Sequence, residues 1–419
     1  MERAKNLLVS LLRWSEKYTK TDMLYLAKGG FWMAMGQAVS YASLLALALA
    51  FANFIPQEVY GQYKYVLSIA GIFAIFTLPG MSTAIARAVA RGEETTVRAA
   101  TRARVLWSFG GVMFALLLAC YYHFIGGNAL LATAFLIVAA TLPFLDTFTL
   151  FDSYLLGKRR FKTQTAYYAL TQAVCAPILI GALYFTDSLL LILTAYFAPL
   201  ILTRFAIHHV VLRNTPSTPF DSTTLVYGKH LTAMNILGVV SGNIDKILLW
   251  HFLGPIQLAV YTFALAVPEQ VKGPIKAVAE LAFPKFAAQT PEQVRDNLPA
   301  LKRKMFLYAL VLIAASLLYL PVAPFIYQIF FPQYVESILY SQVYMLAAFA
   351  LVGSIPLSIL EAHKKIREQY LFTTVQPIMQ TIFYVALIPF FGVMGAIIAK
   401  VLVRLFYVTY TFRLLKKSF

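Results

Sequence analysis

Four charged residues recur at helical spacing along one apolar stretch. Glu269, Lys272, Lys276 and Glu280 lie in VYTFALAVPEQVKGPIKAVAELAFPK, at successive intervals of three, four and four residues. At about 100° per residue, the four side chains fall within an arc of about 80°, so they share one face of a helix. Ammonium groups on such a face bind anions such as phosphate, and carboxylates beside them supply counter-charge.

This stretch is long enough to cross a membrane, where each charge at the bilayer centre costs roughly 2.5–3.5 kcal/mol. Four charges facing lipid would cost about 10 kcal/mol, so the face must meet water, protein or substrate. One interpretation is a structural stripe in which each glutamate pairs with its neighbouring lysine. The other is the wall of a hydrated cavity. Pro268, Gly273 and Pro274 favour the cavity, because they interrupt the backbone ladder where a bend or hinge is useful.

The preceding apolar stretch carries Asp245 and Lys246. Polar and small residues form a stripe of roughly 100° along it, which predicts a second polar wall. The stripe consists of Thr232, Asn235, Gly242, Asn243 and Lys246. The alternative is that small and amide residues pack one helix against another. That alternative explains Lys246 least well.

Other charges also lie within apolar stretches. Lys64 lies near the outer end of its stretch, where it either snorkels outward or faces a cavity. Asp146, in LPFLDTF, either carries a coupling proton or pairs with a lysine of a neighbouring helix. The last stretch places Lys400 and Arg404 on a common face.

The balance of these deep charges is positive, since five cations outnumber three acids. The cations are Lys246, Lys272, Lys276, Lys400 and Arg404, and the acids are Asp146, Asp245 and Glu269. A cationic cavity favours anions such as a phosphate or diphosphate head group.

The elements that position these residues are predicted to be membrane-spanning helices. Of 419 residues, 60% are apolar and 13% are charged, whereas a soluble protein carries about 25% charged residues. Apolar runs of membrane-crossing length recur along the whole chain, which predicts an all-α polytopic membrane protein of about twelve helices. The expected spans are 28–52, 62–88, 104–124, 129–153, 164–185, 188–212, 229–252, 258–284, 304–326, 337–360, 368–390 and 393–412.

The loops between these spans alternate in charge. Segments 87–104, 158–162, 204–230, 285–304 and 361–367 and both termini hold several Lys or Arg, and the intervening loops hold none. Excess positive charge marks the cytoplasmic side, so both termini are expected there. The net charge of +17 is then mostly a signal of topology and of attraction to anionic lipids, and it does not indicate nucleic acid. Residues 1–27 are expected to form an amphipathic segment on the cytoplasmic surface, without the features of a cleavable signal.

An internal repeat predicts two bundles of six helices, 28–215 and 216–419. Pro56 and Tyr63 in the first half correspond to Pro255 and Tyr261 in the second. The fourth helix of each half also carries a proline in mid-span, Pro143 or Pro356. Parallel repeats of this kind typically place a substrate site between them, near the middle of the membrane.

No catalytic motif is recognisable. All six histidines fall at helix ends or in loops, and neither a Walker lysine motif nor a dinucleotide fingerprint is present. Cys120 and Cys175 lie inside apolar segments and are expected to pack there as small residues. The loops without Lys or Arg are short and nearly uncharged, which opposes a glycosyl polymerase or ligase that would have to hold its acceptor there. These observations predict no metal, no cofactor and no enzymatic activity.

Two segments resemble the polysaccharide-repeat flippases. GQAVSYASLLALALAFANFIPQEVYGQYKYVLSIAGIFAIFTLPGMSTAIARAVARG is similar to the opening of these proteins, and NIDKILLWHFLGPIQLAVYTFALAVPEQV is similar to their seventh and eighth helices. The family, which includes the O-antigen flippases, belongs to the multidrug/oligosaccharidyl-lipid/polysaccharide (MOP) superfamily. The residues that carry the resemblance are Tyr60, Gly61, Gly80, Arg87, Asp245, Lys246, Gly254 and Tyr261.

The resemblance implies two six-helix bundles that form a V-shaped, cationic cavity. It also implies export of undecaprenyl-diphosphate-linked oligosaccharide across a bacterial inner membrane, for lipopolysaccharide or related polymers, by alternating access. The expected partners are this lipid-linked substrate, anionic lipids and other membrane proteins of polysaccharide assembly. The first, second, seventh and eighth helices line the cavity in relatives. The first-half wall of this chain departs from a strongly basic pattern.

The residues with an expected role in transport lie in both halves. We expect Lys272, Lys276, Lys246, Lys64 and Arg404 to line the cavity and hold the diphosphate. Asp245, Glu269 and Asp146 would supply counter-charge or a coupling proton, and Tyr63, Tyr261 and Asn243 would contact sugar.

Two other functions compete with this hypothesis. A multidrug exporter of the same superfamily would need acidic walls for cationic drugs, which the charge balance opposes. A membrane glycosyl polymerase or ligase is the second alternative.

Overall fold

The computed structural model describes residues 23–213, 215, 222–273, 286, 289–363 and 365–419. Every regular element in these ranges is a helix, which confirms the predicted all-α class. The predicted surface helix of the N-terminal segment falls mainly on residues 1–22, outside the described ranges.

The first half contains eight α-helices and two short 3₁₀ helices among the described residues. The α-helices are α2 (Met23–Phe54), α3 (Gln57–Phe73), α4 (Met81–Ala90), α5 (Thr96–Phe124), α6 (Ala129–Leu145), α7 (Leu150–Gly157), α8 (Phe161–Phe185) and α9 (Leu189–Leu212). The 3₁₀ helices are η1 (Ala74–Thr77) and η2 (Thr147–Thr149).

The second half is described by longer helices. Its α-helices are α10 (Ser222–Ala266), α12 (Pro291–Phe330), α13 (Ser337–Leu346), α14 (Ser354–Ala362) and α15 (Ile366–Ser418). Its 3₁₀ helices are η3 (Pro268–Val271), η4 (Pro332–Tyr334) and η5 (Ala347–Gly353).

Ten helical segments of the described ranges are long and apolar enough to cross a membrane. Two of them are each interrupted by a glycine with non-helical backbone angles, Gly254 (φ 79°) in α10 and Gly392 (φ 56°) in α15. Glycine suits these positions because other residues rarely adopt a positive φ. The interruptions fall between the spans predicted at 229–252 and 258–284 and at 368–390 and 393–412. Splitting the two segments there gives the twelve predicted crossings.

Large apolar side chains remain exposed along the outside of several helices. Examples are Leu106 on α5, Leu202 on α9 and Leu318 on α12, which are 69%, 66% and 70% exposed. Apolar surface of this extent is expected to face lipid in a protein of this composition. The chain is a multi-pass membrane protein.

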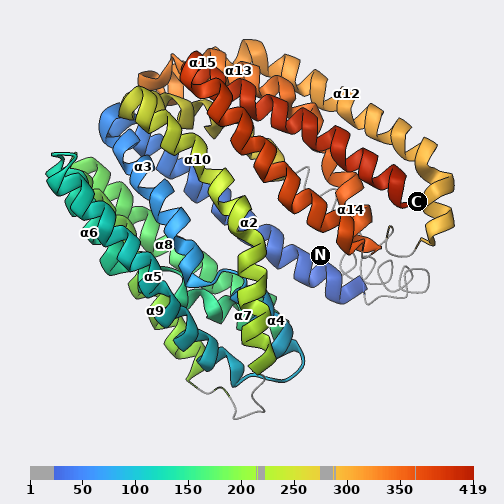
Figure 1. The fold of residues 1–419 in the computed structure, drawn as a ribbon, viewed down its shortest axis with the longest axis horizontal. Coiled ribbons are helices and arrows are strands. Elements are labelled where there is room, and N and C mark those ends of the chain that lie inside the picture. Colours follow the sequence, from blue (N-terminus) through green and yellow to red (C-terminus); the bar gives the residue numbers. More distant parts are fainter. Residues whose placement is uncertain (1–22, 214, 216–221, 274–285, 287–288, 364) are drawn as a thin grey trace, which may run out of the picture.

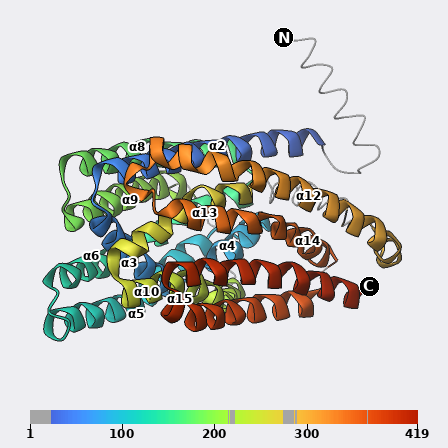
Figure 2. The same ribbon diagram turned by 90° about the horizontal axis from the view of Figure 1, so that it is seen from above.

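The helices form two groups with α10 between them (Figure 1). One group holds α3 to α9, and the other holds α12 to α15. Helix α10 contacts α3 and α4 of the first half and α13 and α15 of the second. Helix α2 lies beside α8, as the view from above also shows (Figure 2).

The two halves are joined at the end where the loops lack Lys and Arg. Asn53 Nδ2 donates a hydrogen bond to the carbonyl oxygen of Phe330 at 3.1 Å, and the Gln57 side-chain amide donates one to the carbonyl of Gln333. Backbones also approach closely here, since a β-carbon on Gly61 would collide with the carbonyl oxygen of Pro255. We call these contacts the uncharged-end seam.

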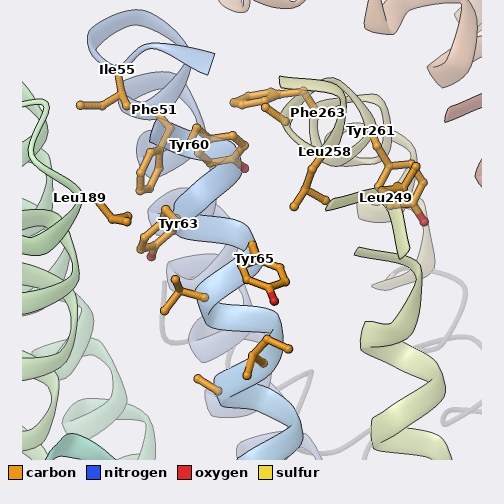
Figure 3. Packing of buried hydrophobic residues seen from close by; sticks show 14 of the residues in the cluster. Phe51, Ile55, Tyr60, Tyr63, Tyr65, Leu189, Leu249, Leu258, Tyr261 and Phe263 are labelled. Carbon is orange, nitrogen blue, oxygen red and sulfur yellow. The ribbon is translucent and has the colours of Figure 1, made fainter. Parts of the chain in front are cut away.

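Aromatic rings fill the space behind this seam. Tyr60 of α3 lies 4.9 Å from Phe263 of α10 and 6.2 Å from Tyr334 of η4, between ring centroids. Tyr65 stacks on Trp250 at 4.3 Å. Figure 3 shows Tyr60 and Tyr65 pointing from α3 toward α10, whereas Tyr63 points toward α9. The seam is therefore both apolar and hydrogen-bonded.

The beginning of α10 packs on the first half at the end of the helices opposite to this seam. The Gly80 amide donates a hydrogen bond to Thr232 Oγ1 at 3.0 Å, and Gly228 lies against Met81. Both glycines permit this approach because a β-carbon on either would clash across the contact. The seventh span thus packs against the first bundle along much of its length.

Irregularities recur at matching places in the two halves. A 3₁₀ segment interrupts the second span of each half, η1 in one and η3 in the other. Another interrupts the fourth span of each half, η2 in one and η5 in the other. The prolines expected in mid-span lie next to these latter breaks, Pro143 in α6 and Pro356 in α14. The division of the chain at residue 215 stays a prediction.

A buried acid stabilises the basic end of the first half. Glu94 is 4% exposed, accepts a hydrogen bond from Tyr154 Oη at 2.7 Å and is paired with Lys158. Burial acts to raise the pKa of Glu94, but the bonds from Lys158 and Tyr154 outweigh it, so the pKa lies below its usual value. The ionised form is therefore favoured by folding.

Replacing Glu94 with glutamine should make the stability of the protein change less between neutral and acidic pH. Because the pKa of Glu94 is lowered, its ionised carboxylate stabilises the folded protein at pH values above the ordinary pKa of glutamate. This contribution is lost as the pH falls. Thermal unfolding should therefore show a lower midpoint for E94Q than for the natural protein at about pH 7, and the difference should shrink near pH 4. The exposed Glu58 provides a control, since E58Q should behave like the natural protein. An E94Q deficit that is equal at both pH values would contradict this account.

Candidate functional site

Eight residues of the second half form a connected group within the membrane-spanning region, which we call the ion-pair cluster. They come from α10, η3, α13, α15 and the residue that follows η3. The members are Asp245, Lys246, Tyr261, Glu269, Lys272, Tyr344, Lys400 and Arg404.

Asp245 is the buried anchor of this cluster, with a side chain that is 1% exposed. It accepts hydrogen bonds from Tyr261 Oη at 2.5 Å and from the Lys246 amide at 2.9 Å. The ammonium groups of Lys246 and Lys400 lie 3.4 Å and 3.5 Å from its oxygens. Two neutral donors and two cations therefore hold this carboxylate in place.

Glu269 is the more accessible acid, with a side chain that is 29% exposed. Lys272 Nζ lies 2.5 Å from its Oε2, and Tyr344 donates a hydrogen bond to its Oε1. Arg404 Nη2 lies 3.6 Å from the same Oε1, which is an ion pair but too long for a hydrogen bond.

Tyr344 and Lys400 connect the two acids. The Arg404 guanidinium stacks on the Tyr344 ring at 3.8 Å from its centroid, and Arg404 Nη1 donates to the Tyr344 carbonyl oxygen at 3.4 Å. Lys400 lies 5.9 Å from the Tyr261 ring and 6.0 Å from the Tyr344 ring. The two carboxylates thus belong to one electrostatic unit.

The cluster is cationic as a whole. Four ammonium or guanidinium groups face two carboxylates, so two positive charges are left among the described members. Accessibility rises toward Lys272, whose side chain is 46% exposed, compared with 24% for Lys246 and 9% for Arg404. An anion would therefore reach Lys272 first.

One face of α10 leads to this cluster. Asn235, Gly238, Gly242 and Lys246 follow one another at helical spacing, and the first three are exposed. A β-carbon on Gly238 or Gly242 would meet no described atom within 4 Å outside its own helix. Three members of the predicted polar wall, Asn235, Gly242 and Lys246, therefore lie on a face of α10 that borders open space. Its other two members pack on the first half: Thr232 against Gly80 and Asn243 against Gly71.

The structure brings together most of the residues to which a role was assigned. Lys246, Lys272, Arg404, Asp245, Glu269 and Tyr261 all belong to the ion-pair cluster. Lys276, and Glu280 of the same predicted face, lie outside the described residues. Sequence reasoning missed Tyr344, because a tyrosine in an apolar run gives no signal of an ionic partner. The four-residue spacing of Lys400 and Arg404 did indicate a common face.

Lys64 and Tyr63 lie on α3, in the other half. Lys64 Nζ is 5.1 Å from the Tyr60 ring and close enough to Lys246 for the two charges to repel. Tyr63 is 3% exposed, stacks on Phe51 at 4.9 Å and contacts Tyr196 of α9. Lys64 thus faces the second half, whereas Tyr63 lies in the core of the first in this conformation.

Asp146 lies apart from the ion-pair cluster, in the first half. Its carboxylate is 3.8 Å from Arg204 of α9 and accepts a hydrogen bond from Thr77 Oγ1 at 3.2 Å. Arg104, which is 1% exposed, donates to its backbone carbonyl at 2.6 Å. The partner of this acid is therefore an arginine, where a lysine was considered.

Replacing Asp245 with alanine should destabilise the protein strongly. The change leaves Lys246 and Lys400 without this counter-ion and removes the acceptor of Tyr261. Breaking a buried pair typically costs about 3–5 kcal/mol, and the partial exposure of both lysines reduces the expected loss to about 2–3 kcal/mol. Thermal unfolding in detergent would measure it.

The exposed Asp187 supplies the matched control for this prediction. D187A should unfold like the natural protein. Adding K400A to D245A should recover part of the lost stability, because it removes one uncompensated charge. Equal midpoints for D245A and D187A would contradict the anchoring role.

The chain matches a known protein family over more than half of its length. Residues 26–288 match the family described as polysaccharide biosynthesis protein. The chain belongs to this family. The matched region includes four charged members of the ion-pair cluster, from Asp245 to Lys272, and stops before Lys400 and Arg404. No curated protein matches the chain.

Several solved transporter structures share its fold. The lipid II flippase MurJ in an inward closed conformation is 13% identical, with a TM-score of 0.69 over 90% of this chain and 86% of MurJ. An inward-facing multidrug resistance MATE family transporter is 15% identical, with a TM-score of 0.64 over 90% and 95% of the two chains. A MOP-superfamily transporter from Pyrococcus furiosus, described as having a binding pocket of reverse polarity, is also 15% identical, with a TM-score of 0.58 over 94% and 95% of the chains. These similarities show that the chain shares the fold of these transporters, and the predicted pair of bundles that form a V is confirmed.

Proposed function

We propose that this protein translocates oligosaccharide linked to a lipid diphosphate, from the cytoplasmic to the periplasmic leaflet of a bacterial inner membrane, by alternating access. The observation that carries the proposal is the excess of positive charge among the described members of the ion-pair cluster. A diphosphate with a substituent at each end keeps two negative charges, one on each phosphate. The two positive charges left in the cluster match them.

The proposed binding groups follow from accessibility and geometry. Lys272 is the most exposed of the cluster's cations and makes the first contact with phosphate. Arg404 offers a planar donor set suited to phosphate oxygens. Lys246 lies on the open face of α10, and Lys64 reaches toward it from the first half. Lys276 follows Lys272 by one helical turn in sequence and is proposed to extend the same cationic surface.

The remaining residues are proposed to serve the rest of the substrate and the transport cycle. Asn243 and Tyr261 border the α10 face, and Tyr63 becomes available to sugar only if the first-half core opens. Asp146, paired with Arg204, is a candidate for the coupling proton. The basic loops lie at the cytoplasmic surface with both termini, where they attract anionic lipids. Other polysaccharide-assembly membrane proteins deliver and receive the substrate.

Two observations support transport over catalysis. The family is described by its part in polysaccharide biosynthesis, and the structures with the same fold are named as transporters and a flippase. A transporter needs a binding site that changes its accessibility, and the uncharged-end seam is suited to such a change. We infer that the chain moves its substrate without altering it.

A deletion strain of the source bacterium would test the proposed function. Loss of the protein should cause undecaprenyl-linked oligosaccharide to accumulate in the inner leaflet, and a plasmid copy should reverse the accumulation. Accumulation of the same lipid in the outer leaflet would instead indicate a polymerase or ligase.

The MATE similarity favours one second candidate, a multidrug exporter. Expression in a drug-hypersensitive strain would raise resistance to cationic drugs if that candidate were right. The flippase proposal predicts no change in resistance, because the cationic cluster repels such drugs.

A further inference from the structure

The two acids of the ion-pair cluster are held in different ways. Asp245 is 1% exposed and is bonded by two neutral donors in addition to two lysines. Glu269 is 29% exposed and has one neutral donor, Tyr344, among the described residues. An anion arriving from water can therefore compete for the partners of Glu269 much more easily than for those of Asp245.

Arg404 provides an independent sign that the Glu269 position suits another ligand. Its side chain is 9% exposed, and Nη2 is buried without a hydrogen-bond partner among the described residues. The nearest acid oxygen, on Glu269, stays 3.6 Å away. A buried guanidinium N–H without a partner is costly, and a phosphate oxygen in place of the carboxylate would satisfy it.

The position of Glu269 in the chain allows its side chain to leave. It lies on the short 3₁₀ helix η3, after Pro268, where the α-helical ladder of α10 has ended. Movement of this segment therefore leaves α10 intact, whereas Asp245 lies in the middle of that long helix. The two cations of Glu269, Lys272 and Arg404, come from different elements and can both receive the incoming anion.

We propose that Glu269 is an internal substitute for the substrate. In the empty protein its carboxylate forms ion pairs with Lys272 and Arg404. The incoming diphosphate displaces this carboxylate into water and binds both cations in its place. Asp245 does not exchange and keeps Lys246 and Lys400 in position. This proposal rests on the proposed function, since it concerns how the same site accepts a lipid diphosphate. The competition weakens substrate binding, which makes release on the far side possible.

Binding of farnesyl diphosphate to the purified full-length protein tests the exchange, with farnesol as the ligand without phosphate. E269Q removes the competing charge and should bind farnesyl diphosphate about three- to tenfold more tightly than the natural protein. E58Q, the same change on an exposed residue at the end whose loops lack Lys and Arg, should leave affinity unchanged. D245N should tighten binding less than E269Q does, because the lysines that it frees are less exposed than Lys272.

The outcomes separate the exchange from the function itself. If the natural protein prefers farnesyl diphosphate to farnesol but E269Q binds it no more tightly, the exchange is wrong and the proposed function stands. If the natural protein binds the two ligands equally, the anion site fails and the exchange fails with it.

A second measurement needs no variant and covers the case in which E269Q does not fold. Brief treatment with a water-soluble carbodiimide modifies accessible carboxylates, and peptide mass spectrometry quantifies each one. Farnesyl diphosphate should raise the modification of Glu269 relative to Glu58, which serves as the internal reference. An unchanged or reduced ratio would overturn the exchange.

Discussion

Cells in which Lys272 and Arg404 are both replaced with alanine should stop exporting surface polysaccharide, although the protein should still reach the membrane. Each of these cations is proposed to make a charge-assisted hydrogen bond to phosphate, worth about 1.5–3 kcal/mol. Losing both should weaken binding by roughly 10²- to 10⁴-fold. Complementation of a deletion strain, with immunoblotting of the membrane fraction, measures both parts of the expectation.

The matched control is K302A/R303A, which removes the same two charge types from exposed positions of α12. This variant should export normally. The variant K272R/R404K keeps both positive charges and should therefore retain part of the export activity. Partial activity in this variant would show that charge at these positions matters, and not only their packing. Normal export by K272A/R404A would show that these two cations of the ion-pair cluster are not needed for transport.

Replacing Gly61 with alanine should impair the closure of the uncharged-end seam. The new β-carbon would collide with the carbonyl oxygen of Pro255, so α3 and α10 would have to separate. Overpacking of this kind costs about 1–3 kcal/mol, which corresponds to a shift of roughly 5- to 150-fold away from the closed arrangement. Export should fall accordingly, because this end is closed in a smaller fraction of the molecules.

Thiol labelling would show the separation directly. Cys120 and Cys175 are first replaced with serine, and a cysteine is placed at Gln57 in the seam. A water-soluble reagent should label this cysteine faster in G61A than in the parent. G181A is the control, since no described atom lies within 4 Å of the added carbon outside its own helix. Unchanged labelling and export in G61A would show that the seam tolerates the extra carbon.

The membrane spans were predictable because their signal is local and strong. Twelve apolar runs with alternating basic loops leave little freedom, and the structure places helix breaks at Gly254 and Gly392, between runs that were counted separately. Interruptions within a span were harder to foresee. Pro143 and Pro356 indicated breaks, but the left-handed Leu78 that ends η1 has no comparable signal in sequence.

The ion-pair cluster was only partly predictable. Helical spacing placed Glu269 and Lys272 on one face, and the cost of charges in lipid excluded a lipid-facing position for that face. Periodicity carries no information on which helices become neighbours, so the pairing of Asp245 with Lys400 could not be foreseen across 155 positions of sequence. For the same reason, a lysine was considered as the partner of Asp146, and the partner is Arg204. Long-range partners require the fold.

The contact of Gly80 and Met81 with the start of α10 has a consequence for biogenesis. When the sixth span has entered the membrane during synthesis, the α4 surface that receives Thr232 and Gly228 is still bare. It is covered only after the ribosome has delivered the seventh span. The first bundle therefore completes its packing only after the seventh span is present.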